Sequence, residues 1–131
     1  MEKKVNYHKI LSDALCMKWD TKYFDVHHIN HNRDDNKLNN LVLIPKKLHK
    51  RYHLLVRLAS SYCDDILKKD VSHITASHIN TLSMLIECKN DMAIIYQEQM
   101  NAINNINRLG YSEEILDMYF ANIREILIKF K

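Results

Sequence analysis

The sequence predicts a mainly α-helical protein with one small β hairpin in its first half. Its 131 residues include one glycine and one proline, which argues for few tight turns. Hydrophobic residues make up 47% of the chain, as in ordinary globular proteins, and they recur at helical spacing over most of its length. Residues 23–29 and 41–44 instead have the aromatic and β-branched content of strands. We therefore expect a strand–loop–strand–helix unit followed by a helical C-terminal region.

The elements around the hairpin follow from simple local signals. Residues 6–18 predict a short helix because their apolar side chains share one face. Residues 30–40, between the two strands, are dense in Asn and Asp, which favour turns. Pro45 then opens a helix that continues to about residue 68, since the missing N–H of proline costs little at a helix start.

The rest of the chain predicts two further helices. A long one begins near residue 76, with Thr75 or Ser77 as its cap, and ends at Gly110, the only glycine. Ser112 can cap the last helix. We therefore divide the chain into residues 1–68, a strand-containing module with its leading helix, and residues 69–131, a helical region.

Charge is distributed unevenly between these parts. The net charge is +3, but residues 1–60 hold twelve basic and six acidic side chains, whereas residues 61–131 hold seven and ten. A polyanionic partner is therefore expected at the N-terminal half. The helical residues 70–131, acidic and rich in Met, Ile and Leu, are expected to bind another protein or to self-associate.

Membrane and disulfide roles are not indicated. No apolar run approaches the roughly 18 residues that a membrane span needs, and the N-terminus leads into no secretory hydrophobic region. Three widely separated cysteines do not suggest a disulfide framework. A cytoplasmic location is expected.

The groups able to do chemistry concentrate in residues 25–53. His49 and His53 lie one turn apart on the predicted helix, so they can share one metal ion. His27 and His28 are adjacent on a predicted strand and point to opposite sides, so only one can readily join that ion. The other is free to act as a general base, because imidazole titrates near neutral pH. This division of roles suits phosphodiester hydrolysis.

The order of these residues resembles the HNH endonuclease motif, or ββα-metal finger. The resemblance is to small phage and homing-type members and, at the His-x-x-x-His end, to the DNase colicins. It covers about residues 24–53 and departs from the family at His31, where a glycine is often found. It rests on Phe24-Asp25-Val26-His27-His28-Ile29-Asn30, Asp35-Asn36, Asn39-Asn40-Leu41-Val42-Leu43 and His49-Lys50-Arg51-Tyr52-His53.

The resemblance implies a role for each of five residues. His27, His49 and His53 would bind the metal, and His28 would be the general base. Asn40 would tie the loop together and help to orient that base. One divalent ion is implied; three imidazoles favour zinc on ligand type, while magnesium, manganese and nickel are also compatible.

DNA is the implied substrate, held through its phosphate backbone by residues 24–57. Phosphate contacts give affinity without reading sequence, and no element that would set a target sequence is apparent. The basic residues expected to make these contacts are Arg33, Lys37, Lys46, Lys47, Lys50 and Arg51.

Two other functions fit the same residues. A catalytically silent HNH-like module could hold a structural metal and act through protein contacts, for instance as a phage-encoded inhibitor of a host defence nuclease. A transcriptional or packaging accessory could bind DNA without cutting it. A structural metal predicts a closed site with four ligands, for which Asp25 or His31 is available, whereas a catalytic metal predicts an open position. We expect the metal-dependent endonuclease, in a bacterial or phage-infected cell.

Overall fold

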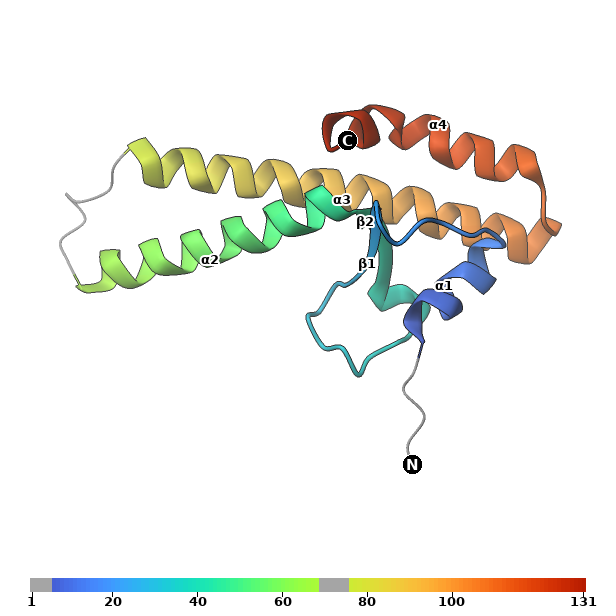
Figure 1. The fold of residues 1–131 in the computed structure, drawn as a ribbon, viewed down its shortest axis with the longest axis horizontal. Helices are drawn as coiled ribbons and strands as arrows, with labels where there is room; N and C mark the ends of the chain where they lie inside the picture. Colours follow the sequence, from blue (N-terminus) through green and yellow to red (C-terminus); the bar gives the residue numbers. More distant parts are fainter. Residues whose placement is uncertain (1–5, 69–75) are drawn as a thin grey trace.

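The architecture is a long helical spine that carries a small hairpin and three other helices. The computed structural model describes residues 6–68 and 76–131, with the backbone alone for 63–68. Helices α2 and α4 run beside α3, and the hairpin and α1 lie together below it (Figure 1). The prediction of a mainly helical fold with a small hairpin is confirmed. The elements are α1 (Tyr7–Leu15), β1 (Phe24–His28), the 3-10 turn η1 (Leu38–Asn40), β2 (Leu41–Pro45), α2 (Lys46–Lys68), α3 (Ala76–Leu109) and α4 (Glu113–Lys129).

The hairpin passes directly into α2. Strands β1 and β2 pair antiparallel, with His27 opposite Val42 and His28 opposite Leu41. All five residues of β2 are buried, as its continuous apolar run predicts. The Lys46 amide donates to the Tyr23 carbonyl (2.8 Å), so the chain begins helix α2 while still bonded to the start of β1. No loop separates the second strand from the helix.

Helix α1 leads into the hairpin and is anchored in the core. The Asn6 side chain accepts a hydrogen bond from the Lys9 amide (3.1 Å) and so caps its first turn. Leu11 and Leu15 are fully buried. The helix ends three residues earlier than residue 18, where the sequence placed its end, because Cys16 adopts a left-handed conformation (φ 52°).

The C-terminal helices pack on the hairpin rather than standing apart from it. Buried residues of α1, both strands, α2, α3 and α4 form one hydrophobic cluster. Within it, the side chain of Gln99 is fully buried. It accepts a hydrogen bond from the Leu43 amide (2.7 Å) and donates one to the Leu41 carbonyl (2.9 Å). Helix α3 thereby satisfies backbone groups on the edge of β2 that β1 cannot reach.

Beyond this core, the start of α3 and the end of α2 project as an antiparallel arm (Figure 1). Three apolar residues of α3, Ile79, Leu82 and Ile86, lie on this arm and are exposed. In the described parts of the chain, no helix is long and apolar enough to cross a membrane.

The predicted helix ends of the second half are largely confirmed. Gly110 has a left-handed conformation (φ 84°), and its amide donates to the Ile106 carbonyl (2.8 Å), which ends α3. Ser112 occupies the N-cap of α4 but makes no side-chain capping bond. Ser77 lies inside α3, and Thr75 lies outside the described residues.

Replacing Gln99 by Leu should destabilise the protein strongly. The substitution keeps an apolar body but leaves the buried Leu43 amide and Leu41 carbonyl unpaired, which should cost about 2–6 kcal/mol in the free energy of unfolding. Urea unfolding measures it. Gln97→Leu is the matched control, because Gln97 is exposed and its side chain bonds Asn101 on the same helix. Equal effects of the two substitutions would show that the buried bonds do not hold α3 to β2.

Candidate metal centre and active site

Three imidazoles converge where β1 meets the first turns of α2. His27 comes from the strand, and His49 and His53 come from successive turns of the helix. Nε2 of His49 lies 3.2 Å from Nδ1 of His27 and 2.9 Å from Nε2 of His53, and all three ligand atoms lie within 4.8 Å of one another. Two nitrogens bound to one tetrahedral ion at 2.0–2.1 Å would be about 3.3 Å apart. These three residues could therefore hold one metal ion.

Asp25 fixes the tautomer of the central ligand. Its Oδ2 lies 3.0 Å from Nδ1 of His49, and because a carboxylate only accepts, that nitrogen carries the proton. The Nε2 lone pair of His49 then points at His27 and His53. One lone pair serves two N–H donors poorly, whereas a cation can accept a lone pair from each ring. The donor set thus fits a metal, with Asp25 behind it as the carboxylate partner of a ligating histidine.

Burial favours the neutral form of two of these histidines, His27 and His53. Desolvation, followed by the charges of His49, His53, His31 and His28, lowers the pKa of His27 to about 3. Burial also lowers the pKa of His53, with smaller contributions from His49, His31, Arg57 and Arg33. Neutral imidazole is the species that binds a metal, so the protein does not need to release a proton from His27 near neutral pH.

His28 is held apart from the three ligands, with one nitrogen available. Its Nε2 lies 2.9 Å from Oδ1 of Asn36, and its ring makes a T-shaped contact with the ring of Tyr7, with centroids 4.8 Å apart. An amide oxygen only accepts, so Nε2 carries the proton and Nδ1 keeps a lone pair. His28 and His27 nevertheless line the same cavity. The part of Asn36 was missed from sequence, although the Asp35-Asn36 pair belonged to the resemblance.

Asn40 holds the loop between the strands. Its buried side chain accepts from the Asn30 amide (2.9 Å) and donates to the Asn30 side chain (2.9 Å) and the Asp35 carbonyl (2.8 Å). Among the described residues, its side chain makes no hydrogen bond to His28. It acts on the segment that carries Asn36, whose side chain makes the direct contact.

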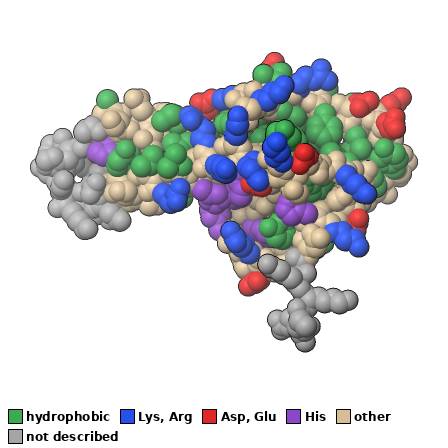
Figure 2. All heavy atoms as spheres, in the orientation of Figure 1, with side chains coloured by type: hydrophobic (Ala, Val, Ile, Leu, Met, Phe, Trp, Pro, Cys, Tyr) green, Lys and Arg blue, Asp and Glu red, His purple; other side chains and the backbone are tan. Residues whose placement is uncertain are grey.

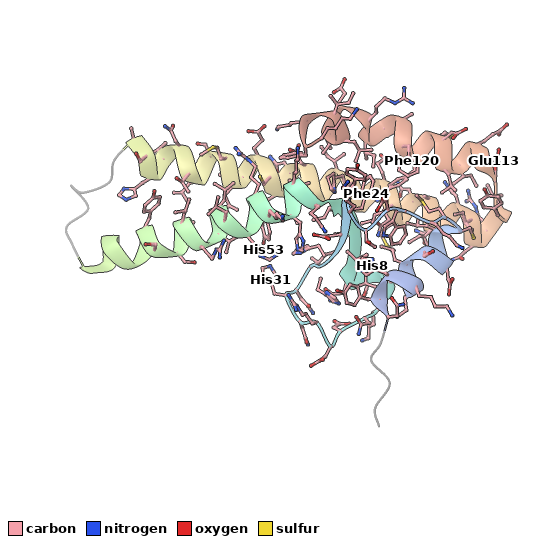
Figure 3. All side chains as sticks on the ribbon, in the orientation of Figure 1. His8, Phe24, His31, His53, Glu113 and Phe120 are labelled. Carbon is pink, nitrogen blue, oxygen red and sulfur yellow. The ribbon has the colours of Figure 1, made fainter. Side chains whose placement is uncertain are left out.

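His31 lies at the turn after β1 in the left-handed conformation (φ 64°) that glycine would adopt easily. Its amide donates to the His28 carbonyl (3.0 Å), and its Nε2 lies 3.2 Å from the Tyr52 hydroxyl. Its ring centroid is 5.8 Å from that of His53, and Figure 3 shows the two side chains close together below α2. Among the described residues, neither His31 nor Asp25 joins the three converging nitrogens.

The histidines line a cavity of about 920 Å³ on one face of the molecule (Figure 2). Of the six basic residues predicted to meet phosphates, Arg33 and Lys50 line this cavity. Arg57, one helical turn after His53, also lines it and was missed, although its spacing from His49 and His53 was visible in the sequence.

The other four predicted contacts lie elsewhere. Lys46 sits behind the cavity, 3.7 Å from Oδ1 of Asp25. Lys47 and Arg51 line a separate cavity beside the end of α4, where Lys47 bonds the Lys131 carbonyl and Arg51 contacts the sulfur of Met84. Lys37 is exposed in the loop.

Comparison with known proteins places this site in a family. Residues 18–51 match the family model described as HNH endonuclease. The chain carries an HNH motif. The match supports a nuclease-type hydrolase, includes three of the four central histidines and ends just before His53. No curated protein and no solved structure matches the chain.

The buried His27 should make the metal-free HNH finger sensitive to acid. The unfolded chain takes up this proton near pH 6.5, whereas the folded protein does so only near pH 3. The unfolded state therefore binds more protons between these values, and stability should fall as the pH is lowered through this window. Urea unfolding in the presence of a chelator measures it. His27→Gln should flatten the dependence; an unchanged slope would mean that His27 does not cause it.

Proposed function

We propose that the protein is a metal-dependent HNH endonuclease that hydrolyses phosphodiester bonds in DNA. One observation carries this proposal: a single cavity holds three converging imidazoles and a fourth imidazole, His28, kept separately with a nitrogen free to accept a proton. Because neither Asp25 nor His31 provides a fourth ligand, a position remains for a substrate oxygen.

Each residue has a distinct part in this proposal. A divalent ion bound by His27, His49 and His53 would supply Lewis-acid chemistry at the scissile phosphate and the departing 3′-oxygen. Nδ1 of His28 takes a proton from the attacking water, while Asn36 holds the ring by its other nitrogen. Asn40 keeps the loop that carries Asn36 in place. Three imidazoles favour zinc or another transition metal over magnesium on ligand type.

The charges around the cavity support a polyanionic substrate. In the described chain, Arg33, Lys50 and Arg57 have no acidic partner, whereas Lys46 pairs with Asp25 and Lys129 with Glu87 and Asp91. Cations without an acidic partner repel one another, and they repel a nearby metal ion, unless an anion lies between the charges. A DNA backbone provides a row of such anions.

A module that binds a protein without cutting DNA is the second candidate. The exposed apolar residues Ile79, Leu82 and Ile86 on the projecting arm favour it, because contiguous apolar side chains on a surface mark contact sites. In that case a metal at the histidines would be structural only. Cleavage assays separate the two candidates.

Substitution of single histidines should separate metal binding from cleavage. Nicking of supercoiled plasmid is followed with Mg²⁺, Mn²⁺, Ni²⁺ or Zn²⁺, and bound metal is measured by chelator competition. His28→Ala should keep the metal and lose cleavage, because it removes only the base, whereas His49→Ala should lose both. His78→Ala, on the arm, should cleave like the wild type. Cleavage by His28→Ala at the wild-type rate contradicts the assigned base; metal binding by the wild type without any cleavage favours the second candidate.

Charge removal should weaken DNA binding only at the cavity. Lys50→Gln or Arg57→Gln should lower affinity for every duplex tested and reduce the slope of log K against log salt concentration by about 1 each. Arg51→Gln, which removes the same charge from the same helix on another face, should change neither. Anisotropy of a labelled duplex over a salt series measures both quantities. A loss of affinity in Arg51→Gln equal to that in Arg57→Gln would place the DNA elsewhere.

A further inference from the structure

We propose that His8 is a further substrate-binding residue, which donates its Nε2–H to a non-bridging oxygen of the phosphodiester in the cavity. This inference rests on the proposed function and deepens it. His8 lies on α1, before residues 18–51 that match the HNH family model, so the motif itself assigns it no role.

The fold brings His8 to the cavity from a separate element. The half-buried ring lines the same cavity as His27, His28, His49 and His53. Figure 3 shows it beside the hairpin, on the side away from His31 and His53. Helix α1 is held rigidly there by its two fully buried leucines, Leu11 and Leu15. The ring is therefore presented by the core and not by a loose terminus.

Trp19 fixes which nitrogen of His8 carries the proton. The indole Nε1–H donates to Nδ1 of His8 (3.4 Å). An indole nitrogen can only donate, so Nδ1 must offer a lone pair, and the neutral ring carries its proton on Nε2. Burial, opposed by the nearby Asp25 and assisted by Lys46, lowers the pKa of His8 and favours the same neutral form.

The Nε2–H of His8 has no acceptor in the described chain. Asp25, the one carboxylate of the described chain that lines this cavity, is already engaged, with Oδ2 bonded to His49 and Oδ1 beside Lys46. No buried side-chain nitrogen or oxygen of the described chain lacks a partner, so this Nε2–H reaches solvent and can donate to an acceptor on a bound ligand. In a cavity bordered by the unpaired cations Arg33, Lys50 and Arg57, the ligand that supplies acceptor oxygens is a phosphodiester.

Binding of a short DNA duplex to the metal-free protein tests this contact without requiring cleavage. Trp19 is the only tryptophan, so its fluorescence should change when DNA reaches His8, and anisotropy of labelled DNA gives the affinity. His8→Phe should weaken binding about tenfold or more, as expected for loss of a hydrogen bond to a charged group. His8→Gln, which keeps an N–H near the Nε2 position, should recover most of the loss.

Two controls exclude a merely structural role. Lys9→Gln removes a charge from the same helix outside the cavity and should bind DNA like the wild type. Trp19→Phe should weaken binding in the wild type but add nothing in His8→Phe, because Trp19 acts only through the His8 tautomer. Chelator competition should give the same metal affinity for all these variants.

The outcomes are distinct. If His8→Phe binds and cleaves DNA like the wild type, the inference about His8 is overturned and the nuclease proposal stands. The same conclusion follows if His8→Gln binds DNA no better than His8→Phe. If His8→Phe binds DNA more weakly than the wild type, but the wild type cleaves DNA with none of the metals, the His8 contact would be supported and the nuclease proposal overturned. If the urea midpoint or the metal affinity of the His8 variants falls together with their DNA affinity, His8 has a structural role and the inference is overturned.

Discussion

The direct junction between β2 and α2 fixes His49 and His53 relative to the strand that carries His27, and these three residues could hold a metal ion. Strand pairing continues to Pro45, and the Lys46 amide is still bonded to the carbonyl of Tyr23 when the helix starts. His49 and His53 are therefore held one and two turns from the hairpin, facing the strand that carries His27. A flexible loop here would let the helix rotate, and a rotation of one residue would turn both ligands by about 100°. The positions of these histidines are fixed because no loop separates β2 from α2.

The side chains that line the cavity near this junction are mostly neutral or positively charged. Asp25 is the one acidic residue that lines the cavity in the described chain, and it is committed to His49 and Lys46. Burial keeps His27 neutral, so without a metal the wall contributes lone pairs rather than charge. Arg33, Lys50 and Arg57, which have no acidic partner in the described chain, also line the cavity. The cavity therefore combines three imidazoles that could hold a metal ion with cations that have no acidic partner in the described chain, and this combination supports the proposed hydrolysis of phosphodiester bonds.

Helix α3 packs against the HNH finger, but its first turns extend beyond the finger. Gln99 bonds the edge of β2, and the Tyr96 hydroxyl donates to the Asn39 carbonyl (3.0 Å), next to the residue that organises the loop. Helix α3 therefore stabilises both the strand and the loop. Its first turns extend past the core with exposed apolar residues, so a second role for the arm is compatible with its support of the finger.

Local spacing in the sequence determined the element order and the pairing of His49 with His53, because helix and strand periodicity act over a few residues. The family resemblance drew attention to His31, where a left-handed turn is made without glycine. Tertiary structure alone decided which side chains complete the site: Asp25 meets His49 across 24 positions, Trp19 meets His8 across 11, and Gln99 meets Leu43 across 56. No periodicity encodes these contacts, since they depend on how buried faces pack and on which donors then lack acceptors.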